Sequence, residues 1–555
     1  MDQELLHKAF LTELEALEAF RIAYTAQYPN APLSHDDPDV RRLIEALAFF
    51  TARTRLAAQR GLNDSIQRIF RQHFPYLLAP MPALAMLRAT PTSRFADASE
   101  LPAGSAVTIH DQPGSQGGPG DRYYFRTLAA MRVLPVHLRS VDTVSVDGGY
   151  RMLLRLQADS PNNQAMDTLS LHVNHLDDLA SSVAVMQELR SHLRGAHVLF
   201  GEKNREEDRG QPIELTFGAH LDREATPDPY LHPLQRARMQ LRFPRSELYL
   251  KFSGLHPPRN WHHVTLCLDL DDSWPRKLRL TSESFELYAV PMINVARAFA
   301  APLDVDGTRD RYVLNHPDAS AGFVPLWTMA AQRPSKEGFI PLAPAVFGNR
   351  GDSFEAWAEG RGTSRRGYAS FQLAGAYNKP ERISVDAFWH QPRLSADNGA
   401  GWKVSLHERF IEGAAWDLSG AIVPSWDAWI DDDREAQLEL VSMKTIKELG
   451  RDELLLLLAA CGAKEESLYA KLFSAISEVR TTTAPQGRRP GQLTLTYEVL
   501  FRNLEASDIP RLALFRRWME DLLSNWCDDA PNIVAVVPNL DVRIGPTPEG
   551  ESAAR

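Results

Sequence analysis

Apolar residues recur at helical spacing at the start of the chain. Five of them, within the first 24 positions, follow one another at intervals of four, four, three and seven. They are Leu6, Phe10, Leu14, Leu17 and Tyr24. Residues spaced in this way share one face of a helix. The pattern therefore predicts an amphipathic helix, which Pro29 ends.

A second helix is predicted to begin with Asp37 as its N-cap and Pro38 in its first turn, and to end at Gly61. Its length would be roughly 35 Å. Its apolar positions are Val40, Leu43, Ile44, Leu47 and Phe50. A third, shorter helix is predicted from about Asp64, with Ile66, Ile69 and Phe70 facing inward, and it must stop before Pro75.

Three helices built from about 75 residues make a thin core. We therefore expect this region to complete its core against another polypeptide, although such helices can also simply cover their own domain. The residues predicted to form the interface with partner helices are Leu6, Phe10, Leu14, Leu17, Tyr24, Val40, Leu43, Leu47 and Phe50.

From Leu84 onward the pattern changes to short β-rich runs separated by turn residues. One helix is expected at 176–193, and residues 333–366 are expected to be a linker or exposed loops. Helices are predicted at 444–461, 466–479 and 509–526, with an alternating strand at 492–499. The prediction is an α+β multidomain protein: an N-terminal helical region (1–83), central antiparallel β domains (84–320), a β-rich and loop domain (321–440), and a C-terminal α+β domain (441–555).

Composition excludes several classes of protein. No run of about 18 apolar residues appears, and the first residues lack the basic start and apolar core of a secretory signal, so we expect a cytoplasmic protein. The net charge of −10 gives no broad attraction for nucleic acid or anionic lipid. Cys267, Cys461 and Cys527 lie far apart, which indicates buried thiols and argues against a disulfide framework or a zinc site.

Residue chemistry predicts no enzyme, metal site or cofactor. The glycine-rich loop at 114–120 lacks a following Gly-Lys-Ser/Thr and fails as a phosphate cradle. The histidine clusters, His172 with His175 and His262 with His263, have no ligand partners at a recognised spacing. The acidic groups at 269–272 and 431–433 lack the calcium-loop pattern and are interpreted as turn residues.

The order of several segments resembles the TssF family, a baseplate subunit of the bacterial type VI secretion system. The segments that carry the resemblance are 37–53, 74–82 (FPYLLAPMP), 124–127, 133–136, 285–295 (FELYAVPMINV), 301–303 and 491–496, which precedes Phe501. The segment 285–295 resembles the family's central Pro-x-Ile-Asn motif. Residues 377–380 depart from the Asn-Arg-Asp-Leu-Pro stretch expected of the family.

The resemblance implies a structural wedge protein, related to those of contractile phage tail baseplates, without catalytic activity. It implies that two copies join one TssG subunit and contact a TssK adaptor, a TssE sheath initiator and a VgrG spike, in a baseplate docked at the inner membrane through its partners. We expect neither nucleic-acid binding nor direct membrane insertion. Our hypothesis is that residues 1–75 enter a shared helical bundle, while the C-terminal domain pairs the two copies.

Two other readings stay open on the sequence. One is a carbohydrate- or peptidoglycan-directed enzyme, in which Trp261, Trp274, Trp389 and Trp402 line a sugar groove between two facing carboxylates. The other is a stand-alone adhesion or scaffold module, which requires no helical partner.

Overall fold

The computed structural model describes residues 3–30, 33–34, 37–110, 122–162, 165–201, 208, 210–218, 233–335, 338–345, 351–373, 376, 379–394, 402–407, 409–446, 448–464, 468–485, 493–526 and 531–545. The chain divides into two compact units. Unit 1 comprises residues 1–78 and 429–446, and unit 2 comprises residues 79–428 and 447–555. Unit 1 is therefore completed by a segment that lies far from the N-terminus in sequence.

Unit 1 is helical. It contains α1 (Gln3–Gln27), α2 (Pro38–His73), α3 (Pro75–Leu78), η6 (Trp429–Asp431) and α6 (Arg434–Met443). The Asp37 side chain accepts a hydrogen bond from the Asp39 backbone N–H at 2.9 Å, so the predicted N-cap of α2 is confirmed. The predicted end at Gly61 is wrong, because α2 runs through this glycine as one helix of 36 residues.

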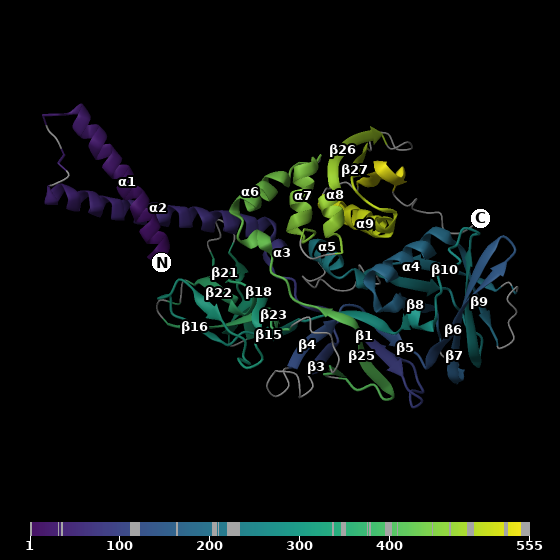
Figure 1. The fold of residues 1–555 in the computed structure, drawn as a ribbon. Helices are drawn as coiled ribbons and strands as arrows, with labels where there is room; N and C mark the ends of the chain where they lie inside the picture. The colour runs from purple at the N-terminus through teal and green to yellow at the C-terminus, as the bar shows by residue number, and fades with distance from the viewer. Residues whose placement is uncertain are drawn as a thin grey trace. The chain divides into compact units, whose positions relative to one another are not determined.

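The two long helices of unit 1 form a hairpin in which they cross each other, at the purple end of the chain in Figure 1. Arg55 of α2 donates to Glu13 of α1 at 2.8 Å, which links the two helices. The C-terminal half of α2 packs on α6, and Gln67 donates to Asp431 at 3.0 Å. Phe70 and Ile66 are buried there. Burial at this end explains why one helix persists across Gly61, whose intrinsic cost is only about 1 kcal/mol.

Unit 2 begins with two antiparallel sheets that share one core. The six-stranded sheet has the order β24 (Lys403–Leu406), β3 (Ala106–His110), β4 (Arg122–Thr127), β14 (Ala289–Ile293), β1 (Leu84–Pro91) and β25 (Ala414–Val423). The eight-stranded sheet has the order β13 (Phe285–Leu287), β8 (Thr168–Val173), β11 (Tyr249–Ser253), β10 (Gln211–Phe217), β9 (Leu193–Phe200), β12 (Trp261–Leu270), β7 (Gly149–Asn162) and β6 (Val136–Val146). Two further strands, β2 (Ser99–Leu101) and β5 (Met131–Val133), form a separate two-stranded sheet.

Short helical segments connect these strands. They are η1 (His175–Asp177), α4 (Leu179–His192), α5 (Pro233–Arg242), η3 (Pro244–Glu247) and η4 (Ser282–Ser284). The helix predicted at 176–193 is thus present as α4, whose N-cap is Asp178.

A second pair of sheets encloses its own core between residues 296 and 390. One sheet has the order β15 (Ala296–Phe299), β23 (Glu381–His390), β18 (Val324–Ser335) and β19 (Gly338–Pro341), with β16 (Leu303–Val305) also on β23. The other has the order β17 (Tyr312–Leu314), β22 (Arg366–Gln372), β21 (Ser353–Glu359) and β20 (Ala343–Pro344), with η5 (Gly362–Ser364) between two of its strands. The linker predicted at 333–366 is therefore wrong, because strands of both sheets occupy much of it.

The C-terminal part of unit 2 is a four-stranded sheet with helices, and Figure 1 draws it in green and yellow. The sheet order is β26 (Ile476–Pro485), β27 (Leu493–Phe501), β28 (Asn532–Val537) and β29 (Val542–Ile544). Its helical segments are α7 (Arg451–Ala460), α8 (Ala470–Ala475), η7 (Ala506–Asp508), α9 (Ile509–Trp526) and η8 (Pro538–Leu540). β27 and β28 pair in parallel, and α9 connects them.

Two predictions in this region need correction. The helix predicted at 444–461 is only α7, which begins at Arg451, so the predicted start is wrong; α6 ends before this range, at Met443. The helix predicted to end at 479 is only the short α8, which gives way to β26 at Ile476. The helix predicted at 509–526 is confirmed as α9. The α+β multidomain class is confirmed, while the predicted domain boundaries stay predictions.

Candidate interaction surface

The predicted interface residues separate into two sets in unit 1. The α1 positions, together with Val40 of α2, are all half-buried. The α1 positions are Leu6, Phe10, Leu14, Leu17 and Tyr24. No described side chain of α1 is fully buried, so the hairpin covers this apolar face only in part.

The three remaining predicted residues stay largely in solvent. Leu43, Leu47 and Phe50 are 70%, 50% and 63% exposed. Spacings of four and three place them within about 60° of one another on a helix of 3.6 residues per turn. The buried Ala48 and Ala52 lie on the opposite side of α2. We call Leu43, Leu47 and Phe50 the α2 stripe.

Further apolar side chains of unit 1 are exposed. They are Leu5, Leu11, Phe20, Ile22 and Tyr28 of or next to α1, Phe49, Leu62 and Ile69 of α2, and Leu438 and Ile446 of the 429–446 segment. The prediction that Ile69 faces inward is therefore wrong, because this side chain is 36% exposed. Exposed apolar side chains are ordinary when single, but neighbouring ones such as the α2 stripe often mark a site of contact with another protein. An exposed apolar surface on a helical hairpin is suited to contact with helices of another chain.

The Pro-x-Ile-Asn motif at residues 291–294, which carries part of the family resemblance, has a structural role in unit 2. Asn294 is fully buried at the end of β14, where it accepts from the Gln391 backbone N–H at 2.7 Å and donates to the Tyr124 carbonyl at 2.9 Å. Gln391 in turn accepts from the Tyr124 N–H at 2.9 Å. This network joins β4, β14 and the segment after β23, so it connects the six-stranded sheet to the second pair of sheets.

A buried carboxylate connects the six-stranded and eight-stranded sheets. Glu286 of β13 receives hydrogen bonds from Ser419 of β25 at 2.6 Å, Asn174 at 3.0 Å and His172 of β8 at 3.2 Å. Arg88 of β1 lies 3.3 Å from Oε1, the oxygen to which Asn174 also donates. Burial raises the pKa of Glu286, but the hydrogen bonds and charge of these neighbours outweigh burial and lower the pKa to about 2. These partners come from both sheets and the segment after β8, so Glu286 has a structural role.

The other histidine and acidic candidates also have structural partners. His175 bonds Ser284 at 3.0 Å, and the rings of His262 and His263 contact each other at 2.9 Å. Asp271 bonds His192 at 2.8 Å, and Asp433 caps α6. Among the described residues, no group of three or more His, Cys, Asp or Glu side chains is arranged to hold a metal ion.

The thiols of Cys267 and Cys461 are buried, as predicted, and desolvation raises their pKa to about 11 and about 12. Cys527 and the glycine-rich loop at 114–120 lie outside the described residues.

The tryptophans proposed for a sugar groove do not form one. Trp261, Trp274 and Trp389 are buried in the two cores, and Trp402 packs on the first of them. Their ring faces are therefore occupied by protein side chains.

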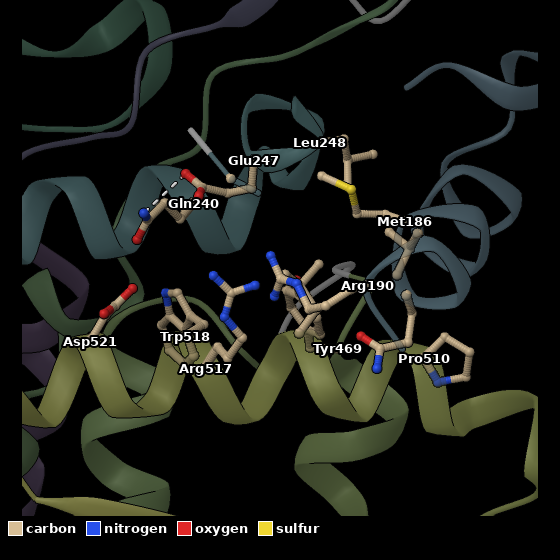
Figure 2. A pocket seen from close by; sticks show the side chains of 14 residues that line it. Met186, Arg190, Gln240, Glu247, Leu248, Tyr469, Pro510, Arg517, Trp518 and Asp521 are labelled. Carbon is tan, nitrogen blue, oxygen red and sulfur yellow. Dashed lines mark hydrogen bonds between the residues drawn. The ribbon is translucent and has the colours of Figure 1, made fainter. Parts of the chain in front are cut away.

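A small hollow lies where α9 faces α4 and α5 (Figure 2). Figure 2 shows Arg190 and Arg517 extending into it beside Tyr469 and Trp518, with Glu247 bonded to Gln240 at 3.0 Å. Its volume of about 40 Å³ holds a few water molecules and no sugar or nucleotide. The two arginines are balanced by Glu247 and Asp521 in the same lining, so the hollow has no marked charge preference.

In the part of the chain that the structure describes, no helix combines the length and apolar character needed to cross a bilayer.

Comparisons with known proteins connect this fold to a secretion machine. The family model described as "Type VI secretion system, TssF" matches residues 1–323. A chain of a solved structure titled "Structure of the type VI secretion system TssK-TssF-TssG baseplate subcomplex revealed by cryo-electron microscopy" matches 92% of this chain and 99% of its own length, with a TM-score of 0.74 and 17% identity. A chain of a second structure, "The baseplate complex from the type VI secretion system", matches 98% of each chain with a TM-score of 0.61 and 17% identity. Comparison with curated protein sequences finds no match.

Proposed function

Because this chain belongs to the TssF family of the type VI secretion system, we propose that it is a structural subunit of the baseplate that binds a TssG-like subunit through its N-terminal helices. The observation that carries this proposal is the exposed α2 stripe of unit 1. A helical hairpin with exposed Leu and Phe side chains gains stability when partner helices cover them.

The wider assembly is part of the same proposal. Two copies of the chain join one TssG-like subunit, and the C-terminal α+β region pairs the two copies. TssK-like adaptor, TssE-like sheath initiator and VgrG-like spike subunits complete the contacts, and the cytoplasmic baseplate docks at the inner membrane through these partners. The match to a chain of a TssK-TssF-TssG subcomplex supports the TssG-like and TssK-like partners.

We propose no catalytic role. The carbohydrate-directed alternative depended on tryptophans lining a groove, and three of the four named tryptophans are buried. The family of the chain also favours a structural subunit.

The test is co-expression of the full chain with the TssG-like subunit of the same secretion system, followed by affinity purification and light scattering. We expect a complex of two copies with one TssG-like subunit. The variant L43S/L47S/F50S should fold, as judged by circular dichroism, and should lose the complex, because the α2 stripe no longer offers apolar surface.

A matched control removes three exposed apolar residues of unit 2 instead. The variant L176S/F339S/F410S changes the same number of large exposed side chains and should co-purify with the partner as the wild type does. Retention of the complex by the stripe variant would refute the proposed interface.

A further inference from the structure

We propose that the α2 stripe is occupied by an amphipathic helix of another protein whose apolar seam is flanked by acidic residues. This inference rests on the proposed function, because it takes α2 to be an interface and adds the chemistry of its occupant. The basis is a row of arginines that runs along one side of the stripe.

The row consists of Arg42, Arg53 and Arg60, separated by intervals of eleven and seven. At 3.6 residues per turn, these intervals bring the three side chains within about 20° of one another around the α2 axis. The row lies roughly 100° from the centre of the stripe, the angular position from which residues of coiled coils form ion pairs beside an apolar seam. Helix α2 as a whole carries seven arginines against three carboxylates.

The described residues do not neutralise the positive charge of this row. All three arginines are exposed. Arg42 lies 3.9 Å from Asp39, but both side chains are at least 80% exposed, so this pair contributes little. Within the described residues, Arg53 and Arg60 have no ion-pair partner. The row is therefore available to carboxylates of another chain.

The small residues that follow the stripe allow such a helix to lie close to α2. Ala57, Ala58 and Gly61 are exposed, and apart from the neighbouring turns of α2 itself no heavy atom of the described residues lies within 4 Å of the position that a Cβ at Gly61 would take. From Leu43 to Gly61 the face extends about 27 Å, enough for five turns of a partner helix.

A second copy of this chain also offers a helix with the right charge. Helix α1 carries four glutamates against one lysine and one arginine, and its Leu11 and Ile22 are 44% and 62% exposed. However, two of these glutamates already have partners within the chain, since Glu13 pairs with Arg55 and Glu18 pairs with Arg21. Helix α1 of a second copy therefore has little acidic charge left for the arginine row. The charges favour a helix of a different protein.

The experiment measures the affinity of the full chain for the co-expressed TssG-like subunit at two salt concentrations. The variant R42E/R53E/R60E should bind about tenfold to a hundredfold more weakly at low salt, because three flanking attractions become repulsions. The wild-type affinity should fall as salt rises, while the affinity of the variant should rise, because salt screens the attractions in one case and the repulsions in the other. The control R94E/R259E/R309E makes the same charge change at exposed positions of unit 2 and should bind as the wild type does.

A compensating change makes the test specific. Replacing the acidic residues that flank the apolar seam of the partner helix with lysine should restore binding to R42E/R53E/R60E. If L43S/L47S/F50S abolishes binding while R42E/R53E/R60E binds normally, the acidic-helix proposal is overturned and the proposed function stands. If both variants bind normally, the interface itself is refuted. If charge reversal changes only self-association of the chain, the occupant is a second copy and the proposal fails.

Discussion

The buried carboxylate of Glu286 makes a quantitative prediction about acid stability. In the variant E286Q the side chain keeps its size but loses its negative charge, while the groups around it stay in place. The ordinary pKa of 4.5 falls to about 2 in the folded protein. Since one pKa unit is worth about 1.4 kcal/mol, ionisation of this carboxyl stabilises the fold by roughly 3 kcal/mol at neutral pH.

The sign of the pH dependence follows from the direction of this pKa change. A folded-state pKa below the unfolded value means that the stabilisation is present above pH 4.5 and is lost as the pH falls towards 2. About 2 kcal/mol of it should disappear between pH 7 and pH 3. Glutamine imitates the protonated carboxyl, so the difference between wild type and E286Q should shrink by that amount over the same interval.

Urea denaturation, followed by tryptophan fluorescence at pH 7, 5 and 3, measures this difference. The control is E283Q, which removes an exposed glutamate three residues away and should cost little at any pH. A gap between wild type and E286Q that is the same at pH 7 and pH 3 would refute the reasoning, because the lowered pKa would then not be the source of the stability.

Two further predictions concern the contacts that build each unit. Replacing Asn294 with alanine leaves the buried Gln391 N–H and the Tyr124 carbonyl without the hydrogen bonds that Asn294 makes to them. Urea denaturation should show a free energy of unfolding lower by about 2–4 kcal/mol. The control N315A, at an exposed position, should have little effect. In unit 1, E13R or R55E alone should speed hydrogen exchange in α1, because each removes the ion pair between Glu13 and Arg55. The double variant E13R/R55E should restore the wild-type rate, which corresponds to a coupling energy between the two residues of about 0.5–1 kcal/mol. If the effects of the two single changes on the exchange rate simply add in the double variant, the ion pair is refuted.

The elements that the sequence predicts well are those whose local signals agree. Helix α9 has both an apolar stripe and clear ends, and it spans the predicted residues 509–526. The cap of α2 at Asp37 followed from an Asp-Pro pair at a helix start. At these positions propensity, patterning and tertiary structure favour the same conformation.

The errors arise where tertiary contacts outweigh a local signal. Gly61 is a weak helix former, yet α2 continues because its C-terminal half, where Ile66 and Phe70 are buried, packs on the 429–446 segment. No local pattern reveals this contact between distant parts of the chain. The segment 476–485 was predicted to begin as helix, but its β-branched residues pair with β27 instead.

The candidate surface was predictable only in part. Periodicity identified the apolar positions of both long helices. The periodicity of a single helix, however, does not show which of its apolar side chains a neighbouring helix covers. The structure separates the half-buried α1 positions from the exposed Leu43, Leu47 and Phe50. The arginine row was readable from spacings of eleven and seven, but its significance required the knowledge that this side of α2 faces solvent.

Hydrogen exchange in α2, measured on the full chain alone and in complex with the TssG-like subunit, tests the central claim most directly. Peptides that cover residues 43–61 should exchange markedly more slowly in the complex, because a partner helix then covers the α2 stripe and stabilises the helix beneath it. Peptides from α9, whose apolar face is already buried within unit 2, should be unchanged. A stable complex in which residues 43–61 exchange as fast as in the free chain would contradict the account.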